Sequence, residues 1–428
     1  MITMVKSRAA TIKEYGNEID GMVRVARKWI SDTEPPPSDE EILCKCEDMF
    51  FKSGISYKTC SRETVIIIDS INRRLTSRYG ILTVLLDDPD INEIMVNGPD
   101  NIYVEKERTL IRIDDAFTCA NELEEMIRMF ASDVHREINE ANPIVDARLP
   151  SGYRVNGVLK NVALNGPILT IRKFREKEIE MEELVSFETL TKECAADLEA
   201  LVKSGYNIFI SGGTSSGKTT FLNALTAYIG SSERVITIED SAELVISHIE
   251  NKVQLECRVA NSIGKGEVSM TQLIRTSLRM RPDRIIVGEV RGKEVIDMIQ
   301  AMNTGHDGSM STGHGNSIRG MLNRLETMYL SDSQVSLNSV RNQIANAIDI
   351  FVHLRRDATG RRRVVEVAEM IGFYGNEYRL NYLYKTGKRG ALIPTGNGLV
   401  DRERLIRCGH AGILAGPALS TMAGGTSD

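Results

Sequence analysis

The chain has 428 residues, 42% of them hydrophobic and 26% charged, with a formal net charge of -6. This length allows two or three domains, and the acidic balance argues against binding nucleic acid over a broad surface. The longest apolar runs fall short of the ~20 residues that a membrane span needs, and the N-terminus lacks the apolar core of a signal peptide. Seven scattered cysteines without a C-x-x-C pair predict reduced thiols rather than a disulfide framework or a zinc site. We therefore expect a cytoplasmic protein.

Residues 1–80 are predicted to form a helical N-terminal extension. Apolar residues at helical spacing continue to about residue 30, where SDTEPPPSDEE interrupts them. Three prolines cannot sit inside a helix, so this segment is predicted to be a linker or the start of the next helix. Further helices are expected at about 41–51 and 61–79.

Residues 81–175 predict a smaller α/β domain. The strand-like runs INEIMV and NIYVE are separated by an Asn-Gly-Pro turn signal, and TLIRI adds a third strand. Asn121 is expected to cap an amphipathic helix whose apolar residues continue to Ile138. ARLPSGYRVNGVL and ILTIRKF are typical of further strands.

The charged residues 176–184 are the predicted linker to a larger domain at 185–400. In that domain apolar strands alternate with helices, which indicates a mostly parallel sheet covered on both faces. Residues 401–428 are rich in small side chains, and we expect this tail to be partly disordered.

The most informative motif is IFISGGTSSGKTT, in which an apolar strand runs into a glycine-rich loop and then a helix. Its spacing, G-x-x-x-x-G-K-[ST], is that of a phosphate-binding loop whose backbone N–H groups surround a nucleotide's β-phosphate. Lys218 would supply charge for the β- and γ-phosphates, and the hydroxyl of Thr219 would bind Mg²⁺. The residues predicted to bind ATP are Gly212, Gly213, Thr214, Ser215, Ser216, Gly217, Lys218, Thr219 and Thr220.

Two apolar strands deliver acidic residues. RIIVGEV places Glu289 just past its strand, where open parallel sheets put ligand-contacting groups, so Glu289 is predicted to hold Mg²⁺ together with Thr219. In VITIEDSAEL, Glu239 and Glu243 are four residues apart and would face the same way on a helical turn. One of them could orient the attacking water. The alternatives are a surface carboxylate at Glu289 and solvated acids in the second segment.

Histidines and arginines are further candidates. His306 and His314 lie in the glycine-rich MNTGHDGSMSTGHGNS, which favours either a γ-phosphate sensor or two structural histidines. Arg148, Arg154 and Arg172 lie on strand-like segments of the smaller domain. They are either surface salt-bridge partners or an arginine finger that reaches a nucleotide held by the same or a neighbouring subunit.

Four segments in this order resemble the Walker A, Asp, Walker B and His boxes of type II/type IV secretion and type IV pilus motor ATPases: GGTSSGKTT, IEDSAEL, RPDRIIVGEVRG and TGHDGSMSTGH. INEIMVNGPDNIYVE, DARLPSGYRVNGV, LTIRKF and RLETMYL resemble the Tad/Flp pilus assembly branch. The resemblance covers roughly residues 80–385. It implies a RecA-like P-loop NTPase domain, with ATP held between it and the N-terminal domain. It also implies a hexameric ring on the cytoplasmic face of the membrane.

By the same resemblance Glu243 would be the general base, Glu289 the Walker B acid, and His306 and His314 the His-box residues. The second half of the His box, STGHGNS, departs from the family pattern, and the four-cysteine zinc element of many relatives is missing. The implied function is an ATP-driven motor for pilus assembly or protein secretion. Its partner would be an inner-membrane platform protein, with no direct contact to nucleic acid.

Two alternative functions remain open from the sequence. One is a RecA-like nucleic-acid motor of the conjugation or packaging type, against which the acidic balance argues. The other is a GTP-dependent switch, for which the sequence lacks an N-K-x-D guanine-reading motif.

Overall fold

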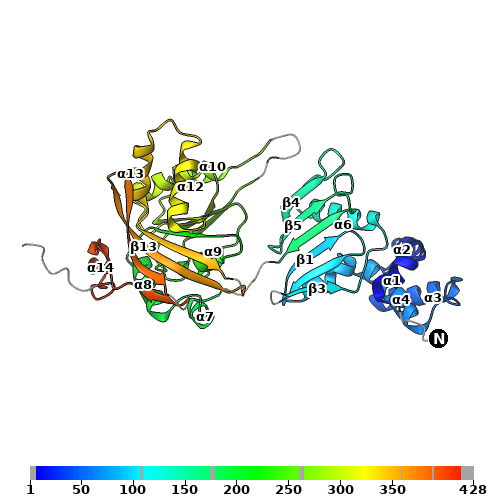
Figure 1. The fold of residues 1–428 in the computed structure, drawn as a ribbon. Coiled ribbons are helices and arrows are strands. Elements are labelled where there is room, and N and C mark those ends of the chain that lie inside the picture. The colour runs from blue at the N-terminus through cyan, green and yellow to red at the C-terminus, as the bar shows by residue number, and fades with distance from the viewer. Residues whose placement is uncertain are drawn as a thin grey trace, which may run out of the picture. The chain divides into compact units, whose positions relative to one another are not determined.

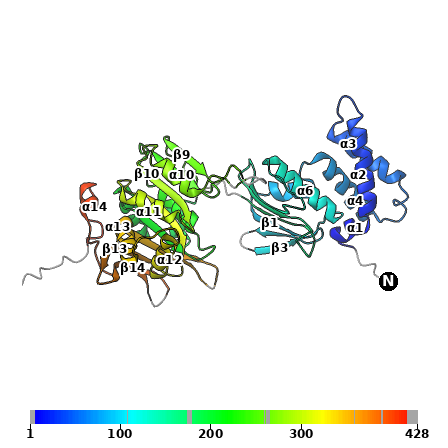
Figure 2. The same cartoon turned by 90° about the horizontal axis from the view of Figure 1, so that it is seen from above.

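The computed structural model describes residues 6–106, 109–173, 179–258, 260, 265–357, 359–387 and 390–415. The chain forms two compact units, which we call unit 1 (Met1–Glu176) and unit 2 (Lys177–Ala260 with Gly264–Asp428) (Figures 1 and 2). Each unit has two hydrophobic cores of its own. Over the described part of the chain, no helix is both long enough and apolar enough to cross a bilayer.

Unit 1 begins with a layer of four helices. They are α1 (Arg8–Glu14), α2 (Gly16–Ser31), α3 (Asp39–Lys52) and α4 (Ser61–Thr76). The proline-rich segment separates α2 from α3, and Ser38 starts α3 with a capping box that includes Glu41. Phe50 and Ile67 lie in the core of this layer and are fully buried. The first 80 residues therefore bury a hydrophobic core.

The rest of unit 1 is a six-stranded antiparallel sheet in the order β3-β2-β1-β6-β5-β4, with α6 on one face (Figure 2). Its elements are η1 (Gly80–Leu82), α5 (Thr83–Asp87), β1 (Ile91–Asn97), β2 (Ile102–Lys106), β3 (Thr109–Ile113), α6 (Ala120–Asp133), β4 (Ile144–Arg148), β5 (Arg154–Val158) and β6 (Ile168–Arg172). The prediction that Asn121 caps the helix is wrong, because α6 starts one residue earlier and its N-cap is Cys119. The helix also ends before Ile138, since the backbone turns left-handed at His135.

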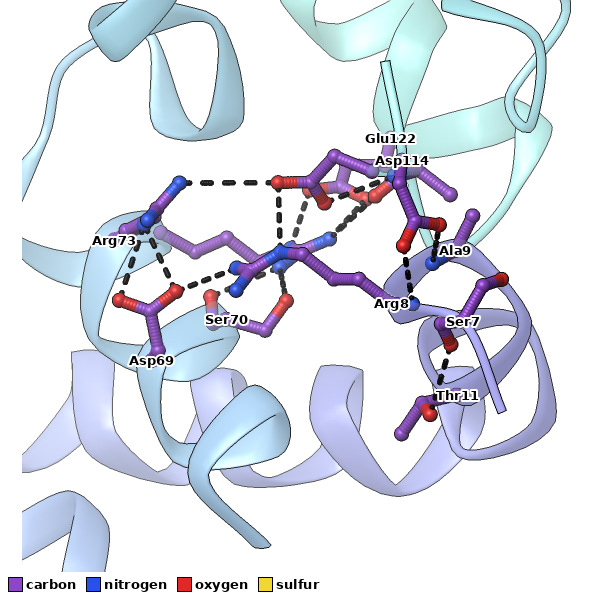
Figure 3. Close-up of polar contacts among 12 residues, drawn as sticks. Ser7, Arg8, Ala9, Thr11, Asp69, Ser70, Arg73, Asp114 and Glu122 are labelled. Atoms are coloured by element: carbon purple, nitrogen blue, oxygen red, sulfur yellow. Dashed lines mark hydrogen bonds and ion pairs between the residues drawn. The ribbon is translucent and has the colours of Figure 1, made fainter. Parts of the chain in front are cut away.

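A network of charged residues ties the four helices to the sheet (Figure 3). Asp114, just after β3, accepts hydrogen bonds from the backbone N–H groups of Arg8 and Ala9, which open α1. On α4, Arg74 donates to both carboxylate oxygens of Glu122 on α6, over 2.5 and 3.2 Å. The Arg74 side chain is only 4% exposed. The helical layer is therefore joined to the rest of unit 1 by a largely buried ion pair and by exposed hydrogen bonds to Asp114.

Arg74→Ala is expected to destabilise unit 1 by about 3–5 kcal/mol, because it leaves the partly buried carboxylate of Glu122 without its partner. Trp29 on α2 is the only tryptophan of the chain, so its fluorescence during urea unfolding follows the helical layer. Arg78→Ala is the matched control, since that arginine pairs with Asp133 but is 65% exposed. A loss of less than about 1 kcal/mol at Arg74, as expected for an exposed pair, would contradict the role of this network.

Unit 2 is a nine-stranded sheet in the order β15-β14-β13-β12-β7-β11-β10-β8-β9. The pairings from β12 to β9 are parallel, and β13, β14 and β15 add an antiparallel edge. The strands are β7 (Ile208–Gly212), β8 (Val235–Glu239), β9 (Lys252–Glu256), β10 (Arg284–Val290), β11 (Met310–His314), β12 (Ile350–Arg356), β13 (Arg362–Tyr374), β14 (Glu377–Thr386) and β15 (Leu392–Pro394).

Helices cover both faces of this sheet, as Figure 1 shows for α7 and α8 on one side and α12 and α13 on the other. They are α7 (Met181–Ser186), α8 (Lys192–Lys203), α9 (Lys218–Thr226), α10 (Met270–Ser277), α11 (Val295–Asn303), α12 (Ile318–Leu330), α13 (Leu337–Ala347) and α14 (Glu403–Arg407). Because both faces are covered, β7 and β8 are buried along their whole length, which explains their largely apolar sequence.

Two segments expected to lack regular structure contain helices. The predicted linker 176–184 runs into α7, whose Met181 and Leu184 are buried in a core of unit 2. In the predicted tail, α14 buries Leu405, and Arg404 donates to Asp349 over 2.5 Å. Residues 174–178 and 416–428 lie outside the described residues. Short amphipathic helices of five or six residues carry too little periodicity to be predicted from sequence.

Candidate active site

The phosphate-binding loop follows β7 and leads directly into α9, which begins at Lys218. Gly217 precedes the helix with a φ of +93° and Ser215 has a φ of +57°, so two residues of the loop are left-handed. A side chain at 217 would be strained in this conformation, which explains the glycine. Left-handed residues that alternate with right-handed ones turn successive backbone N–H groups toward one concavity. The positive end of the α9 dipole lies at the same place. The loop therefore has the geometry of an anion site.

Parallel pairing gathers four strand ends around this loop. Gly212 at the end of β7 is paired with His314 at the end of β11. β10 pairs with β11 and carries Glu289 as its penultimate residue. β8 pairs with β10 and ends at Glu239. Ligands of open α/β sheets bind at this carboxyl edge. Residues from four separate segments of the chain therefore meet at one place.

Three predicted site residues lie in contact there. The Lys218 Nζ lies 3.8 Å from the Glu289 Oε1 and 3.4 Å from the His314 Nδ1. The His314 Nε2 lies 2.8 Å from the same Glu289 oxygen. Burial lowers the pKa of Lys218, and the Glu289 carboxylate opposes this shift. Burial and the Lys218 charge lower the pKa of His314, so its imidazole is neutral at pH 7.

Arg291 is a member of this cluster that the sequence interpretation missed. Its guanidinium donates to the Glu289 Oε2 over 2.6 and 2.9 Å, and it lies 3.4 Å from the Asp240 Oδ2. Arg291 is exposed on the surface of unit 2. The sequence GEVRG could have indicated this contact. Arg291 follows Glu289 by two residues at the end of a strand, so both lie at the same edge of the sheet.

Glu239 and Glu243 do not share a helical turn, so that expectation is wrong. Glu239 is 3% exposed, and its carboxylate accepts hydrogen bonds from the backbone N–H groups of Glu243 and Leu244. A Cβ on Gly288 would lie 2.8 Å from the Glu239 Cγ, so the glycine permits this close packing. The Glu239 side chain therefore shapes the loop that carries Glu243. Glu243 itself is half-buried and lies within the electrostatic range of Arg291.

His306 is not brought to the cluster within the chain. It precedes β11, whereas His314 ends that strand, so the two histidines lie at opposite edges of the sheet. The His306 Nδ1 lies 3.1 Å from the carbonyl oxygen of Ala301, at the end of α11. A γ-phosphate sensor on the same chain is therefore compatible with His314 and not with His306.

The three arginines of unit 1 form one row. Arg148 on β4 pairs with Arg154 on β5, and Arg154 pairs with Arg172 on β6, so all three lie on one face of the sheet. This is the face opposite the core under α6, because the next residue along each strand, such as Val155 or Ile171, is buried. Arg148 and Arg154 are half-buried and Arg172 is exposed. Guanidinium groups in such a row suit the recognition of phosphate.

The residues at the carboxyl edge fit a Mg²⁺–nucleotide. The Glu289 Oε1 is buried and lacks a hydrogen-bond donor in suitable geometry, although the Lys218 ammonium and the His314 imidazole lie nearby. Thr219 follows Lys218 at the start of α9 and is half-buried. A carboxylate and a hydroxyl oxygen are ligands that Mg²⁺ accepts.

His353 is a buried residue beneath the loop that the sequence interpretation also missed. It lies on β12, is 2% exposed, and its Nδ1 is 2.9 Å from the Ser211 Oγ on β7. Burial and the charge of Arg355 lower the pKa of His353 to about 4. Hydrogen bonds to the backbone of Asn316 and Ser211 act in the opposite direction and raise this pKa. A neutral imidazole thus connects the strand before the P-loop to the segment after His314.

A parallel sheet with a P-loop at its carboxyl edge, and an acid on a strand one removed from the P-loop strand, defines a P-loop NTPase. The family model described as "Type II/IV secretion system protein" matches residues 77–381. The conjugal transfer protein TrbB of Rhizobium radiobacter is 34% identical over 315 residues, which cover 72% of this chain and 93% of TrbB. The type IV secretion system protein PtlH of Bordetella pertussis is 32% identical over 309 residues, covering 66% and 91%.

Among solved structures, the pilus retraction motor PilT with bound ADP matches with a TM-score of 0.50 and 19% identity, covering 78% of this chain and 89% of PilT. This likeness agrees with the RecA-like fold class predicted from the sequence, which is confirmed. The chain belongs to the type II/IV secretion system protein family, and it is an ATPase. Its placement in the Tad/Flp branch stays a prediction.

His353 predicts a pH dependence of stability. Its pKa is about 4 in the folded chain and about 6.5 when unfolded, so the unfolded chain binds the extra proton as the pH falls. The stabilisation from the neutral form is complete above pH 6.5 and is lost between pH 6.5 and 4. Between pH 7.5 and 5 this amounts to about 2 kcal/mol.

We expect His353→Asn to remove this part of the pH dependence, which urea unfolding of unit 2 at the two pH values measures. His248→Asn is the control, because His248 is exposed and should leave the slope as in wild type. An unchanged slope in His353→Asn would contradict a neutral, buried imidazole.

Proposed function

We propose that this ATPase is a motor that powers pilus assembly or protein secretion across the cell envelope. The observation that carries the proposal is the meeting of Lys218, Glu289 and His314 within 4 Å at the P-loop. Family membership supports the machine class, since TrbB is named for conjugal transfer and PtlH for type IV secretion.

In this proposal the loop N–H groups and Lys218 bind the β- and γ-phosphates of ATP. Thr219 and Glu289 would hold Mg²⁺, which when bound neutralises charge on the phosphate oxygens. Burial makes the ammonium of Lys218 costly to keep charged without an anion. The cluster is therefore suited to bind a polyphosphate, which adds negative charge next to Lys218, His314 and Arg291.

Glu243 is proposed to orient the attacking water. The Glu239 carboxylate holds the backbone of this segment, so the Glu243 side chain starts from a fixed position. His314 is neutral and can donate one ring N–H to a γ-phosphate oxygen without adding charge. Hydrolysis would then release the contact that His314 makes.

The arginine row of unit 1 is proposed to supply guanidinium groups to a nucleotide bound by unit 2 of the same or a neighbouring subunit. Charge builds up on the transferring phosphoryl group, and guanidinium geometry suits it. We further propose a homo-hexamer on the cytoplasmic face of the membrane, bound to an inner-membrane platform protein. These proposals rest on the family resemblance.

Lys218→Ala is expected to reduce ATP hydrolysis to background and to weaken ATP binding, because Lys218 is the buried cation that faces both Glu289 and the loop. Phosphate release measured at saturating ATP tests this. Lys192→Ala is the matched control, since that lysine opens α8 and is exposed. Wild-type turnover in Lys218→Ala would refute the site.

The same assay, run with and without single-stranded DNA, separates the motor for secretion or pilus assembly from a nucleic-acid motor. The word conjugal in the name of TrbB is the observation that favours this second candidate. Strong stimulation of hydrolysis that disappears at high salt would favour the nucleic-acid motor, because phosphate contacts are salt-sensitive. We expect rates within about 2-fold of each other.

Glu243→Gln is expected to bind ATP almost as wild type but to lower kcat by roughly 10²-fold or more, because only the water-orienting carboxylate is changed. Equilibrium binding of ATP and steady-state hydrolysis measure the two effects separately. Glu250→Gln, an exposed acid of the same connection, serves as the control. Weak binding with near-normal kcat would instead make Glu243 a structural residue.

A further inference from the structure

The hairpin between β12 and β13 carries a cluster of arginines that the motifs do not explain. Five of the nine residues from 355 to 363 are arginine. One of them, Arg362, reaches the P-loop: its Nε donates to the carbonyl oxygen of Ser215 over 3.1 Å. A Cβ at Gly217 would lie 3.1 Å from the Arg362 Cδ, so the stem of Arg362 packs directly against the loop.

This contact lies on the outer side of the P-loop. The N–H groups of the loop converge on the anion site, and the carbonyl groups of the same peptides point away from it. Ser215 has a φ of +57°, a conformation that costs a non-glycine residue about 1 kcal/mol or more. The guanidinium of Arg362 binds the carbonyl of this strained residue, so it stabilises the loop conformation that a phosphate requires.

The same contact also polarises a backbone donor within the loop. The Ser215 carbonyl shares its peptide with the N–H of Ser216, which donates to the Gly213 carbonyl over 3.3 Å in this structure. A charged donor on a peptide oxygen polarises the N–H of that peptide, because hydrogen bonds in a chain reinforce one another. Arg362 therefore acts on both the shape and the polarity of the loop.

The hairpin that presents Arg362 is held on two sides. In its turn, the Asp357 carboxylate accepts from the backbone N–H groups of Thr359 and Arg361, both over 2.9 Å. Beside the turn, the Glu188 Oε2 accepts from Arg361 over 3.1 Å and from Arg363 over 3.2 Å. Glu188 lies between α7 and α8, outside the P-loop. These contacts, which do not involve the loop, help to position Arg362.

We propose that Arg362 is a positioning residue for nucleotide binding: it braces the P-loop from outside, on a hairpin anchored by Glu188. The proposal rests on the proposed ATP site at this loop. Arg362 acts through the loop backbone, so its removal should weaken the binding of ATP and ADP equally. It should leave the chemical step at saturating ATP nearly unchanged.

The test is calorimetric titration with Mg–ADP together with steady-state ATP hydrolysis. For Arg362→Ala we expect Kd and KM to rise about 10-fold, equivalent to about 1.4 kcal/mol, with kcat within about 3-fold of wild type. Arg362→Lys keeps a charged donor on an unbranched stem, and its Kd is expected within about 3-fold of wild type. Glu188→Gln, which leaves the P-loop untouched, should raise Kd by about 2-fold or more.

Arg356→Ala is the matched control, because Arg356 lies on the same hairpin and is exposed. Equal shifts in Arg356→Ala and Arg362→Ala would overturn the proposal, since net charge alone would then explain them. So would an unchanged Kd in a folded Arg362→Ala protein. If Arg362→Ala does not fold, Glu188→Gln decides, and an unchanged Kd in that variant would overturn the proposal. A wild-type protein that neither binds Mg–ADP nor hydrolyses ATP would refute the proposed function instead.

Discussion

The site of this ATPase depends on the parallel pairing of the strands around β7, with an irregularity in the β10–β11 register at the stretch that contains Glu289. Gly212 and His314 are direct partners at one edge of the sheet, and β10 delivers Glu289 beside them. The cluster then holds itself together electrostatically, because the Glu289 carboxylate offsets the cost of burying the Lys218 ammonium. A slip of one residue in this register would turn each of these side chains to the other face.

Much of this arrangement could be predicted from the sequence, because it depends on motifs of adjacent residues. The loop spacing, the apolar strand before it and the acid at the end of RIIVGEV each need only adjacent residues to be recognised. Parallel topology then follows from the alternation of strands and helices, and it brings Lys218, Glu289 and His314 to one edge. The antiparallel sheet of unit 1 was harder to predict, since turn signals and alternating apolar residues do not specify the order of its strands.

The remainder depends on contacts between distant segments. Arg362 reaches Ser215 across 147 positions and His353 reaches Ser211 across 142, and no local spacing predicts either pair. Glu239 has the same sequence environment as an exposed strand-end acid, yet its carboxylate accepts hydrogen bonds from two backbone N–H groups. His306 and His314 are only eight residues apart, yet the strand between them places them at opposite edges of the sheet.

The charge network in unit 1 has a mechanical consequence. Arg74 joins α4 to α6 through buried groups, and Asp114 holds the first turn of α1 (Figure 3). Sliding of α4 past α6 would leave the Arg74 guanidinium, whose side chain is 4% exposed, without its carboxylate partner. We therefore expect the helical layer to resist sliding over the sheet of unit 1.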